Sequence, residues 1–415
     1  MDKLIIFCEH AVETLTYFSR QLAQAFSGWG YEVFWLDFDM IALGAWKLKQ
    51  AVKERDAVLI TFNFIGLSWE EDLWEFDEDG HPDTCIWEQL GIKCLNIMVD
   101  HPIYYYKALQ KTVPGMRTFC IDRDHVVYMK RFYPQIPCEF LPSAGNLNLP
   151  GSESQAERVS EAEDSLYHME PYTEWKMRPF PLVFTANYVP LENIEKQLNH
   201  LEPEYRDFYY EIIDAFVNHP GKDLLSLIEP YMRREIPDLT DEGLRDAMNT
   251  MQAVDLWIRT YFREKTVRIL AESGLPLQIY GQDWERVSWT RPANLAFSGK
   301  AVNSIDCVRA MAQSKIALNV MPWFKDGAHD RIFTAMLQGA VSLTDDSRYL
   351  RENFKDRDTL IFYRLDELEK LPIVVKELLK EPGQLYEIAV RAKALAGKFH
   401  TWSQRAEVIR LYFSE

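Results

Sequence analysis

Long apolar runs and paired cysteines are both missing from this sequence. No run of about 18 apolar residues occurs, so we expect no helix that spans a bilayer. The six cysteines form no Cys-x-x-Cys pair, and several lie inside apolar runs. That pattern is typical of reduced, buried thiols, and it predicts a cytoplasmic protein without a disulfide framework or a zinc site. The chain enters an apolar strand without a cleavage-site pattern, so a signal peptide is not expected.

Basic residues are also in short supply. The 46 Lys and Arg stand against 63 Asp and Glu, which gives a formal net charge of −17. A protein that neutralises the phosphates of nucleic acid needs a net basic face, so we expect no nucleic-acid partner. An anionic membrane surface is not expected as a partner for the same reason.

Several common catalytic motifs are absent. There is no Gly-x-x-x-x-Gly-Lys-[Ser/Thr], which excludes a P-loop, and no Gly-x-Gly-x-x-Gly after the first strand, which removes the main support for a nicotinamide dehydrogenase. Gly-x-Ser-x-Gly and His-Glu-x-x-His are also missing. Two acidic pairs, Asp37/Asp39 and Asp122/Asp124, are possible ligands for a divalent metal near a sugar diphosphate. Such short matches are common by chance, so solvated strand ends are the favoured interpretation, and no metal or other cofactor is expected.

Short apolar runs recur along the chain, with helical spacing between them. The candidate strands lie at 4–8, 31–38, 57–64, 94–99, 117–121 and 138–141 in the first half, and at 182–188, 277–280, 295–297, 316–321, 340–344 and 360–363 in the second. Alternating helices and continuously apolar strands predict parallel sheets covered on both faces. The sequence therefore predicts an α/β protein with two doubly wound, Rossmann-like domains facing across a cleft.

The chain divides near residue 180 in this interpretation. We expect an N-terminal, acceptor-side domain over 1–150, an acidic linker or loop over 151–180, and a second domain over 181–400 with a helical insertion at about 190–274. A last helix at 401–415 is expected to pack back across the boundary. Ligands of such sheets bind at the carboxyl ends of the strands, so the residues that follow strands are the candidates for function.

The segment 316–350 carries the strongest functional signal. A strand is followed by a loop that contains Gly327 and then by a helix over about 329–338, whose free N–H groups and dipole attract anions. Lys325, His329 and Arg331 add cationic side chains at this helix start, and a guanidinium binds phosphate through its planar fork. In the competing interpretation, this is an ordinary capped helix, and Arg331 pairs with Asp326 or Asp330.

The motifs in this half are, in chain order, QIYGQDW at 278–284, FTAMLQGA at 333–340, TD at 344–345 and HTWxxR at 400–405. These motifs resemble the donor-binding half of GT-B-fold glycosyltransferases, most of all the spore-maturation, CgeB-like group, over about 181–408. The resemblance implies metal-independent transfer of a sugar from a nucleotide-sugar donor to an acceptor hydroxyl on a glycan, a protein or a small molecule. The donor sugar, the nucleotide, the acceptor, the stereochemistry and the oligomeric state stay open.

One position departs from the family pattern. Many GT-B enzymes carry two acidic residues eight positions apart that contact the donor sugar and ribose; here these positions hold Asp326 and Thr334. A threonine can bond a ribose hydroxyl without charge, and it leaves a non-catalytic, coat-associated or binding scaffold as the alternative function. Position and resemblance together give the expected donor-binding residues: Asn187, Gly281, Lys300, Lys325, Asp326, Gly327, His329, Arg331, Thr334 and Asp345.

The strand ends of the first half supply candidates for the acceptor side. Glu9 and His10 follow the first strand, and Asp100 and His101 follow the strand at 94–99, with Tyr104 close behind. A base has to deprotonate the acceptor hydroxyl if transfer inverts the anomeric centre, so we expect His10, Glu9 or Asp100 to act as that base. Arg331 is the expected catalytic residue of the second half, because a positioned cation stabilises the diphosphate leaving group.

Overall fold

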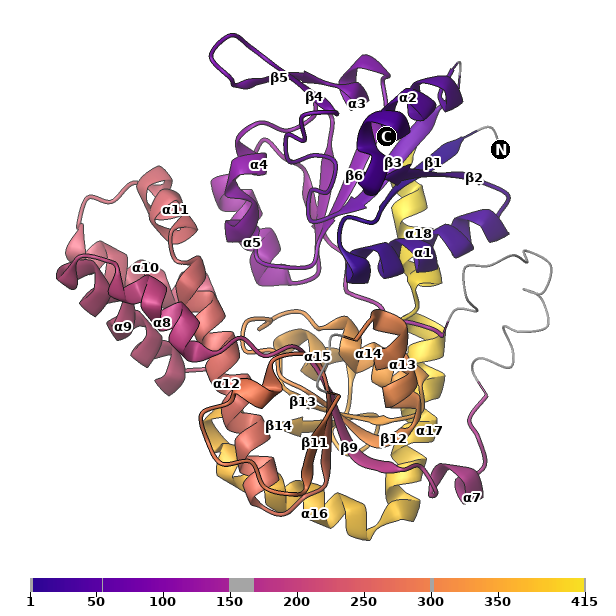
Figure 1. The fold of residues 1–415 in the computed structure, drawn as a ribbon, viewed down its shortest axis with the longest axis vertical. Helices are drawn as coiled ribbons and strands as arrows, with labels where there is room; N and C mark the ends of the chain where they lie inside the picture. The colour runs from indigo at the N-terminus through magenta and orange to yellow at the C-terminus, as the bar shows by residue number, and fades with distance from the viewer. Residues whose placement is uncertain (1–2, 54, 149–167, 299–301, 414–415) are drawn as a thin grey trace. The chain divides into compact units, whose positions relative to one another are not determined.

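The computed structural model describes residues 3–53, 55–148, 168–298 and 302–413, which form two compact units (Figure 1). The first unit contains Met1–Ser143 and Trp402–Glu415, and the second contains Ala144–Thr401. The second unit thus begins before the division near 180 that the sequence suggests, because residues 144–146 pack on one of its helices. Most of the expected acidic segment 151–180 lies outside the described residues.

The first unit is built on a parallel sheet with the strand order β2-β1-β3-β6-β7-β8. Central strand β3 is buried along its whole length, as expected for a strand covered by helices on both faces. The strands are β1 (Leu4–Glu9), β2 (Glu32–Asp37), β3 (Ala57–Phe62), β6 (Lys93–Met98), β7 (Arg117–Cys120) and β8 (Cys138–Phe140). The helices are α1 (Glu13–Gly28), η1 (Phe38–Met40), α2 (Ile41–Ala51), α3 (Ile86–Gln89), η2 (Pro102–Tyr105), α4 (Tyr106–Gln110), α5 (Arg123–Phe132), α18 (Trp402–Arg410) and η5 (Leu411–Phe413).

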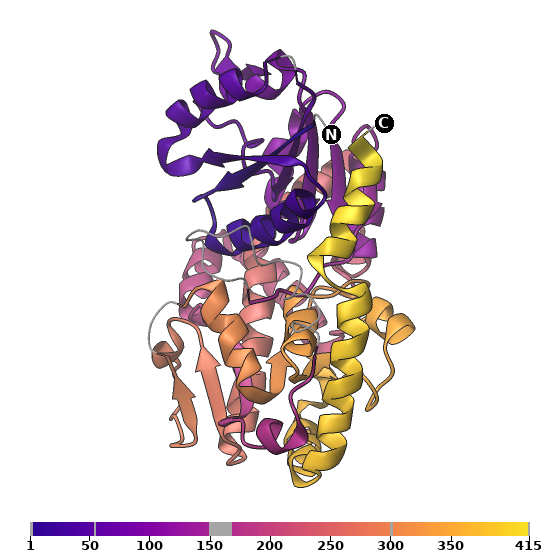
Figure 2. The same ribbon diagram turned by 90° about the vertical axis from the view of Figure 1, so that its right-hand side faces the viewer.

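The C-terminal helix completes the core of this first unit. Helix α18, yellow in Figure 2, lies beside α1, and the ring of Trp402 packs 5.0 Å from Phe18 and 5.6 Å from Phe62. Arg405 is buried and donates to the carbonyl oxygens of Pro142 at 2.6 Å and Ser143 at 2.9 Å. The terminal motif therefore anchors the end of the chain to the first unit.

The second unit has a parallel sheet with the order β11-β10-β9-β12-β13-β14. Strands β10 and β11 follow β9 on one side of the sheet, and β12, β13 and β14 continue on the other side. A topological switch point therefore lies between β9 and β12. The strands are β9 (Phe180–Thr185), β10 (Leu277–Tyr280), β11 (Leu295–Phe297), β12 (Ser314–Asn319), β13 (Val341–Asp345) and β14 (Ile361–Tyr363). The helices are α7 (Tyr172–Trp175), η3 (Trp284–Arg286), α13 (Ser304–Ala312), α14 (Asp330–Leu337), α15 (Arg348–Asn353), η4 (Leu365–Lys370), α16 (Leu371–Lys380) and α17 (Pro382–Phe399).

Five helices connect β9 to β10, where the sequence predicts a helical insertion (Figure 1). They are α8 (Leu191–Asn199), α9 (Pro203–Asn218), α10 (Leu224–Glu235), α11 (Asp241–Asn249) and α12 (Gln252–Glu272). The last of them contacts the loop that follows β12, because the indole of Trp323 donates to the backbone carbonyl oxygen of Asp255 at 3.2 Å.

The predicted fold class is confirmed: each unit is a doubly wound α/β domain, and every one of the twelve predicted strands is present. The acidic run at 69–79 reads from the sequence as an exposed acidic loop, with an acceptor-docking loop as the alternative. Most of its acidic residues are exposed, and it also contributes β4 (Trp74–Phe76), which pairs with β5 (Pro82–Cys85) in an antiparallel hairpin. Buried Trp74 and Cys85 face each other in it, which the surrounding acids obscure in the sequence. Across the described ranges, no helix is both long and apolar enough to cross a membrane.

Candidate functional site

The loop that follows β12 lies at the switch point of the second sheet and is held in one conformation by its neighbours. The backbone amide of Met321 donates to Asp345 Oδ1 at 2.7 Å, and the hydroxyl of Ser347 donates to the carbonyl oxygen of Gly327 at 2.6 Å. The amide of Arg348 donates to the carbonyl oxygen of Lys325 at 2.8 Å. These bonds preorganise the loop in which Lys325, Asp326 and Gly327 were predicted to bind the donor.

Helix α14 begins directly after this loop, with His329 at the N-cap and Arg331 in the first turn. The Nη1 atom of Arg331 and the Nδ1 atom of His329 are both buried, and neither has a hydrogen-bond partner. Burial lowers the pKa of the Arg331 guanidinium, and neighbouring Asp330 opposes that change. Asp326 pairs instead with Arg348, at 3.3 Å from Nε to Oδ2. A partly exposed arginine with one buried, unused donor at a helix N-terminus is suited to an anionic ligand.

Positive charge gathers around His329. Burial lowers the pKa of its imidazole well below the usual 6.5, and the charges of Arg331, Arg263 and Arg259 lower it further, so His329 is neutral at pH 7. Arg259 is itself paired with Asp255, at 2.8 Å from Nε to Oδ1. Three guanidinium groups act on this imidazole, and the carboxylates of Asp255 and Asp330 stand beside two of them, so an anionic ligand would meet cations that are only partly compensated.

Arg259 and Arg263 were not among the predicted site residues, because the segment 190–274 reads as a helical layer. Both lie on α12, four residues apart, and therefore on one face of that helix. Their i, i+4 spacing is visible in the sequence, but it does not reveal that this face meets the start of α14. The structure reveals this proximity, because α12 packs against the loop that follows β12.

A pocket of about 230 Å³ opens at the carboxyl ends of β12, β13 and β14. Lys325 and Asp345 line it and are 5% and 1% exposed, with 3.9 Å between Lys325 Nζ and Asp345 Oδ2. Burial raises the pKa of Asp345 to about 6 although Lys325 acts in the opposite direction, and its Oδ2 has no hydrogen-bond partner. Further charged residues of the lining are Asp346, Arg348, Arg351, Arg364 and Asp366. Alternating donors and acceptors of this kind fit a polyhydroxylated, anionic ligand.

Thr334 is placed differently from the ribose contact that the family pattern suggests. It is 2% exposed, its hydroxyl donates to the carbonyl oxygen of Asp330 at 2.9 Å, and it accepts the backbone amide of Asn146 at 3.0 Å. Gly145 allows this approach, because a Cβ there would lie 2.7 Å from the carbonyl oxygen of Phe333. The packing gives Thr334 a structural task, and a contact with ribose stays a prediction.

The other donor-side candidates lie at the ends of β9 and β10. Asn187 is exposed, and its Oδ1 accepts the amide of Gln282 at 3.1 Å, which ties the two strand ends together. A Cβ on Gly281 would lie 2.0 Å from the carbonyl oxygen of Ala186, so only glycine permits this close approach. Lys300 lies outside the described residues.

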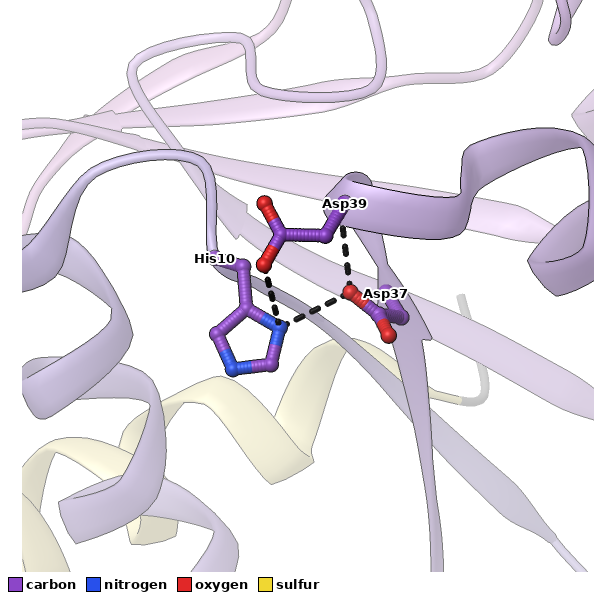
Figure 3. Close-up of side chains that lie close together, drawn as sticks. All are labelled: His10, Asp37 and Asp39. Carbon is purple, nitrogen blue, oxygen red and sulfur yellow. Dashed lines mark hydrogen bonds and ion pairs between the residues drawn. The ribbon is translucent and has the colours of Figure 1, made fainter.

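On the first unit, His10 meets two carboxylates (Figure 3). Its Nδ1 lies 2.8 Å from Asp37 Oδ1 and 3.7 Å from Asp39 Oδ2, and the ligand-type atoms of all three residues lie within 4.8 Å of one another. Strands β1 and β2 are neighbours in the sheet and end at the same edge, which brings His10 and Asp37 together. The hydrogen bond with Asp37 raises the pKa of His10 and lowers that of Asp37.

The remaining acceptor-side candidates have other partners. Glu9 lies 3.8 Å from the guanidinium of Arg20. Asp100 accepts from the side-chain amide of Asn63 at 3.1 Å and from the hydroxyl of Tyr105 at 3.2 Å.

His101 is buried, and its Nδ1 accepts the amide of Ile103 at 3.2 Å as the cap of η2. Tyr104 follows in that short helix. The structure therefore brings His10 together with Asp37, whereas strand β3 separates β1 from β6, the strand that precedes Asp100.

Comparison with known proteins gives a family match to part of the chain and a similar fold over all of it. Residues 259–410 match the protein family described as glycosyl transferase-like. No curated protein sequence matches the chain. An alpha-glucosyltransferase solved in complex with UDP is similar over 100% of both chains at 12% identity, with a TM-score of 0.53. Alr3699/HepE from Anabaena, solved with UDP-glucose, is similar over 99% of each chain at 8% identity, with a TM-score of 0.51. The fold is that of GT-B glycosyltransferases, and the segment 259–410 is glycosyl transferase-like in sequence.

Proposed function

We propose that this protein is a glycosyltransferase that takes a sugar from a nucleotide-sugar donor and transfers it to an acceptor hydroxyl. The observation that carries the proposal is the buried Nη1 of Arg331, which has no hydrogen-bond partner and lies at the N-terminus of α14, inside the segment that is glycosyl transferase-like in sequence. The similar alpha-glucosyltransferase was solved with UDP, and Alr3699/HepE with UDP-glucose. A uridine diphosphate sugar is therefore the first donor to test.

Arg331 and the start of α14 would bind the diphosphate. The anion gains charge as the bond between the anomeric carbon and the diphosphate oxygen breaks, so a fixed guanidinium contact strengthens in the transition state. Arg259 and Arg263 add positive charge at the same place, which the electrostatic effect of both on His329 supports. Lys325 and Asp345 line the neighbouring pocket, where a buried ammonium and a carboxylate are able to bond sugar hydroxyls.

His10 would act as the base on the acceptor side in an inverting reaction. The acceptor oxygen forms the new bond to the anomeric carbon, its proton passes to His10 Nε2, and the diphosphate leaves with the bonding electron pair. Asp37 holds Nδ1–H at 2.8 Å, which fixes the tautomer that leaves Nε2 free to accept and stabilises the imidazolium that forms. Glu9 and Asp100 are the weaker candidates, because Glu9 is ion-paired with Arg20 and Asp100 accepts a hydrogen bond from Asn63.

Catalysis without a metal is part of the proposal, since cations of the chain itself flank the expected diphosphate position. The alternative is a divalent ion held by His10, Asp37 and Asp39, which the 4.8 Å grouping of their ligand atoms favours. Imidazole with two carboxylates is a donor set that Zn²⁺ or Mn²⁺ accepts.

A non-catalytic scaffold remains the other candidate function. The structural engagement of Thr334 favours it, because the residue at the position of the family's second acid is used for packing. We further propose that the chain belongs to the CgeB-like group, on the strength of its FTAMLQGA and HTWxxR motifs, and that it works in the cytoplasm, which its free cysteines support.

The test is a donor screen without acceptor. Many transferases hydrolyse their donor slowly, so the purified protein is incubated with a panel of nucleotide sugars and the released nucleoside diphosphate is measured. Thermal unfolding with the matching diphosphates runs in parallel, because a ligand that binds only the folded state raises the unfolding temperature. A raised unfolding temperature without release of diphosphate would favour the scaffold. If no nucleotide is released and none raises the unfolding temperature, the result contradicts a donor site.

A further inference from the structure

The outer face of α2 in the first unit is apolar and unusually exposed. Met40, Leu43 and Trp46 are 55%, 38% and 60% exposed, and they lie within seven residues of one another. Spacing of three residues places Leu43 and Trp46 on the same side of the helix. Trp46 is a large apolar side chain that gains nothing from water, so a cluster of this kind marks a surface that is covered when the protein works.

The opposite face of α2 fixes this orientation. Gly44, Ala45 and Leu48 are buried, and a Cβ on Gly44 would lie 2.8 Å from the side chain of Leu36 on β2. The helix therefore lies tightly against its strand through small residues. It is unable to rotate Trp46 inward without losing that contact.

Lysines follow the exposed face along the helix, whereas Asp37 and Asp39 precede its start. Lys47, Lys49 and Lys53 are all exposed, and no acidic residue occurs between positions 40 and 53. At 100° per residue, Lys47 lies to one side of the Leu43–Trp46 stripe and Lys49 and Lys53 lie to the other. An apolar centre with a tryptophan and flanking lysines is the pattern of a helix that lies in a lipid interface, where the lysine stems follow the apolar surface and their ammonium groups reach the phosphates.

We propose that this face of α2 docks on the surface of a bilayer that contains anionic lipid. Lipid phosphates complement the three lysines, and the acyl boundary takes up the side chains of Met40, Leu43 and Trp46. The net charge of −17 repels an anionic surface from most other directions, but screening limits that repulsion to about 8–10 Å at physiological salt. Contact is thereby expected through a face that carries lysines beside exposed apolar side chains. The proposal is independent of the donor chemistry and would survive its failure.

The test is co-sedimentation of the full chain with vesicles. Binding to phosphatidylcholine vesicles that contain about one third phosphatidylglycerol is compared with binding to pure phosphatidylcholine, at low and at physiological salt. We expect binding to the anionic vesicles only, weakening with salt. Trp46→Ser is expected to reduce the partition coefficient about tenfold. The triple change Lys47→Gln, Lys49→Gln and Lys53→Gln should reduce it about a hundredfold, at roughly fivefold per lysine.

Matched controls lie on α16, where Ile373 is 59% exposed and Lys380 ends the helix. Ile373→Ser and Lys380→Gln should leave vesicle binding unchanged, and unfolding temperatures check that every variant is folded. Absence of preference for anionic vesicles in the parent protein overturns the proposal. So does binding that survives both α2 variants, or loss of binding in the α16 controls. Self-association that depends on α2, without vesicle binding, would assign this face to a second copy of the chain and contradict the proposed membrane docking.

Discussion

The backbone amide of Asn146 donates to the hydroxyl of Thr334 across 188 positions of sequence, at 3.0 Å. The same hydroxyl donates to the carbonyl oxygen of Asp330, so both of its roles are taken inside the second unit. The side chain of Asn146 adds a bond of 3.1 Å to Asp330 Oδ2, and Gln338 donates to the Asn146 carbonyl oxygen at 3.0 Å. Thr334 thus holds the segment 144–146 against α14, which is the helix whose start carries Arg331.

Replacing Thr334 by Ala should lower stability more than donor affinity. The change leaves the buried Asn146 amide without its acceptor, which costs about 1–3 kcal/mol in the free energy of unfolding, whereas Ser keeps the hydroxyl. Urea unfolding of the parent, the Ala variant and the Ser variant measures this. An Ala variant that is as stable as the parent but binds the donor more weakly would instead establish a ribose contact at this position.

Asp37 should set the acidic limb of the pH–rate profile. The base works only when His10 is deprotonated, so the rate rises as the pH rises through the pKa of His10, which the hydrogen bond with Asp37 raises. Asp37→Asn removes the negative charge, lowers that pKa and moves the limb to lower pH, while a weaker base lowers the maximum rate. The measurement is kcat/KM against pH. Asp39→Asn is the matched control with a smaller shift, and an unmoved limb in Asp37→Asn would remove the pair from catalysis.

Chelation should not abolish transfer. The cationic side chains Arg331, Arg259 and Arg263 are expected to take the place of a metal at the diphosphate, so the rate should persist in excess EDTA after dialysis. Loss of activity that Mn²⁺ or Zn²⁺ restores would favour a metal at His10, Asp37 and Asp39. Asp39→Asn would then weaken the metal's effect, which separates this site from metal bound elsewhere.

Asp345 should make the protein less stable as the pH rises. Its pKa is about 6 in the folded state against an ordinary 3.8, so the folded state holds this proton more tightly than the unfolded chain does. Stability from this group is therefore complete below about pH 4 and is lost as the pH rises through about 6, by at most about 3 kcal/mol. Thermal unfolding of the parent and Asp345→Asn from pH 4 to pH 8 tests the sign. The unfolding temperature of Asp345→Asn should rise relative to that of the parent as the pH increases. Equal changes of both unfolding temperatures with pH would contradict the raised pKa of Asp345.

The sheets were predictable because their signal is local. Each strand is a short apolar run bounded by polar residues, and parallel strands such as β3 are buried on both faces. The hairpin of β4 and β5 is not among the predicted strands, because Trp74 and Cys85 form a single buried apolar pair next to an acidic stretch. Local pattern therefore identifies a strand only when its burial extends over several residues.

The site was predictable only in part, because its geometry is not local. Glycine in a strand-to-helix loop and a cation in the first helical turn make Arg331 a candidate from sequence alone, and its role in donor binding stays a prediction. Its neighbours Arg259 and Arg263 come from a helix inside the insertion, and the partner of His10 comes from the adjacent strand β2. The spacing of residues in the sequence does not reveal these contacts, because they depend on the order of strands in the sheet and on helix packing.

Donor turnover by Arg331→Ala at saturating donor tests the central claim most directly. Alanine keeps the helix and removes a charged contact that strengthens as the diphosphate leaves, so the release of nucleoside diphosphate should fall roughly 30- to 1000-fold. Arg331→Lys should recover only part of the rate, because an ammonium lacks the planar fork, and Arg391→Ala on the exposed face of α17 should change little. A folded Arg331→Ala protein whose rate stays within about threefold of the parent would contradict the account, because so small a change is what loss of a surface ion pair produces.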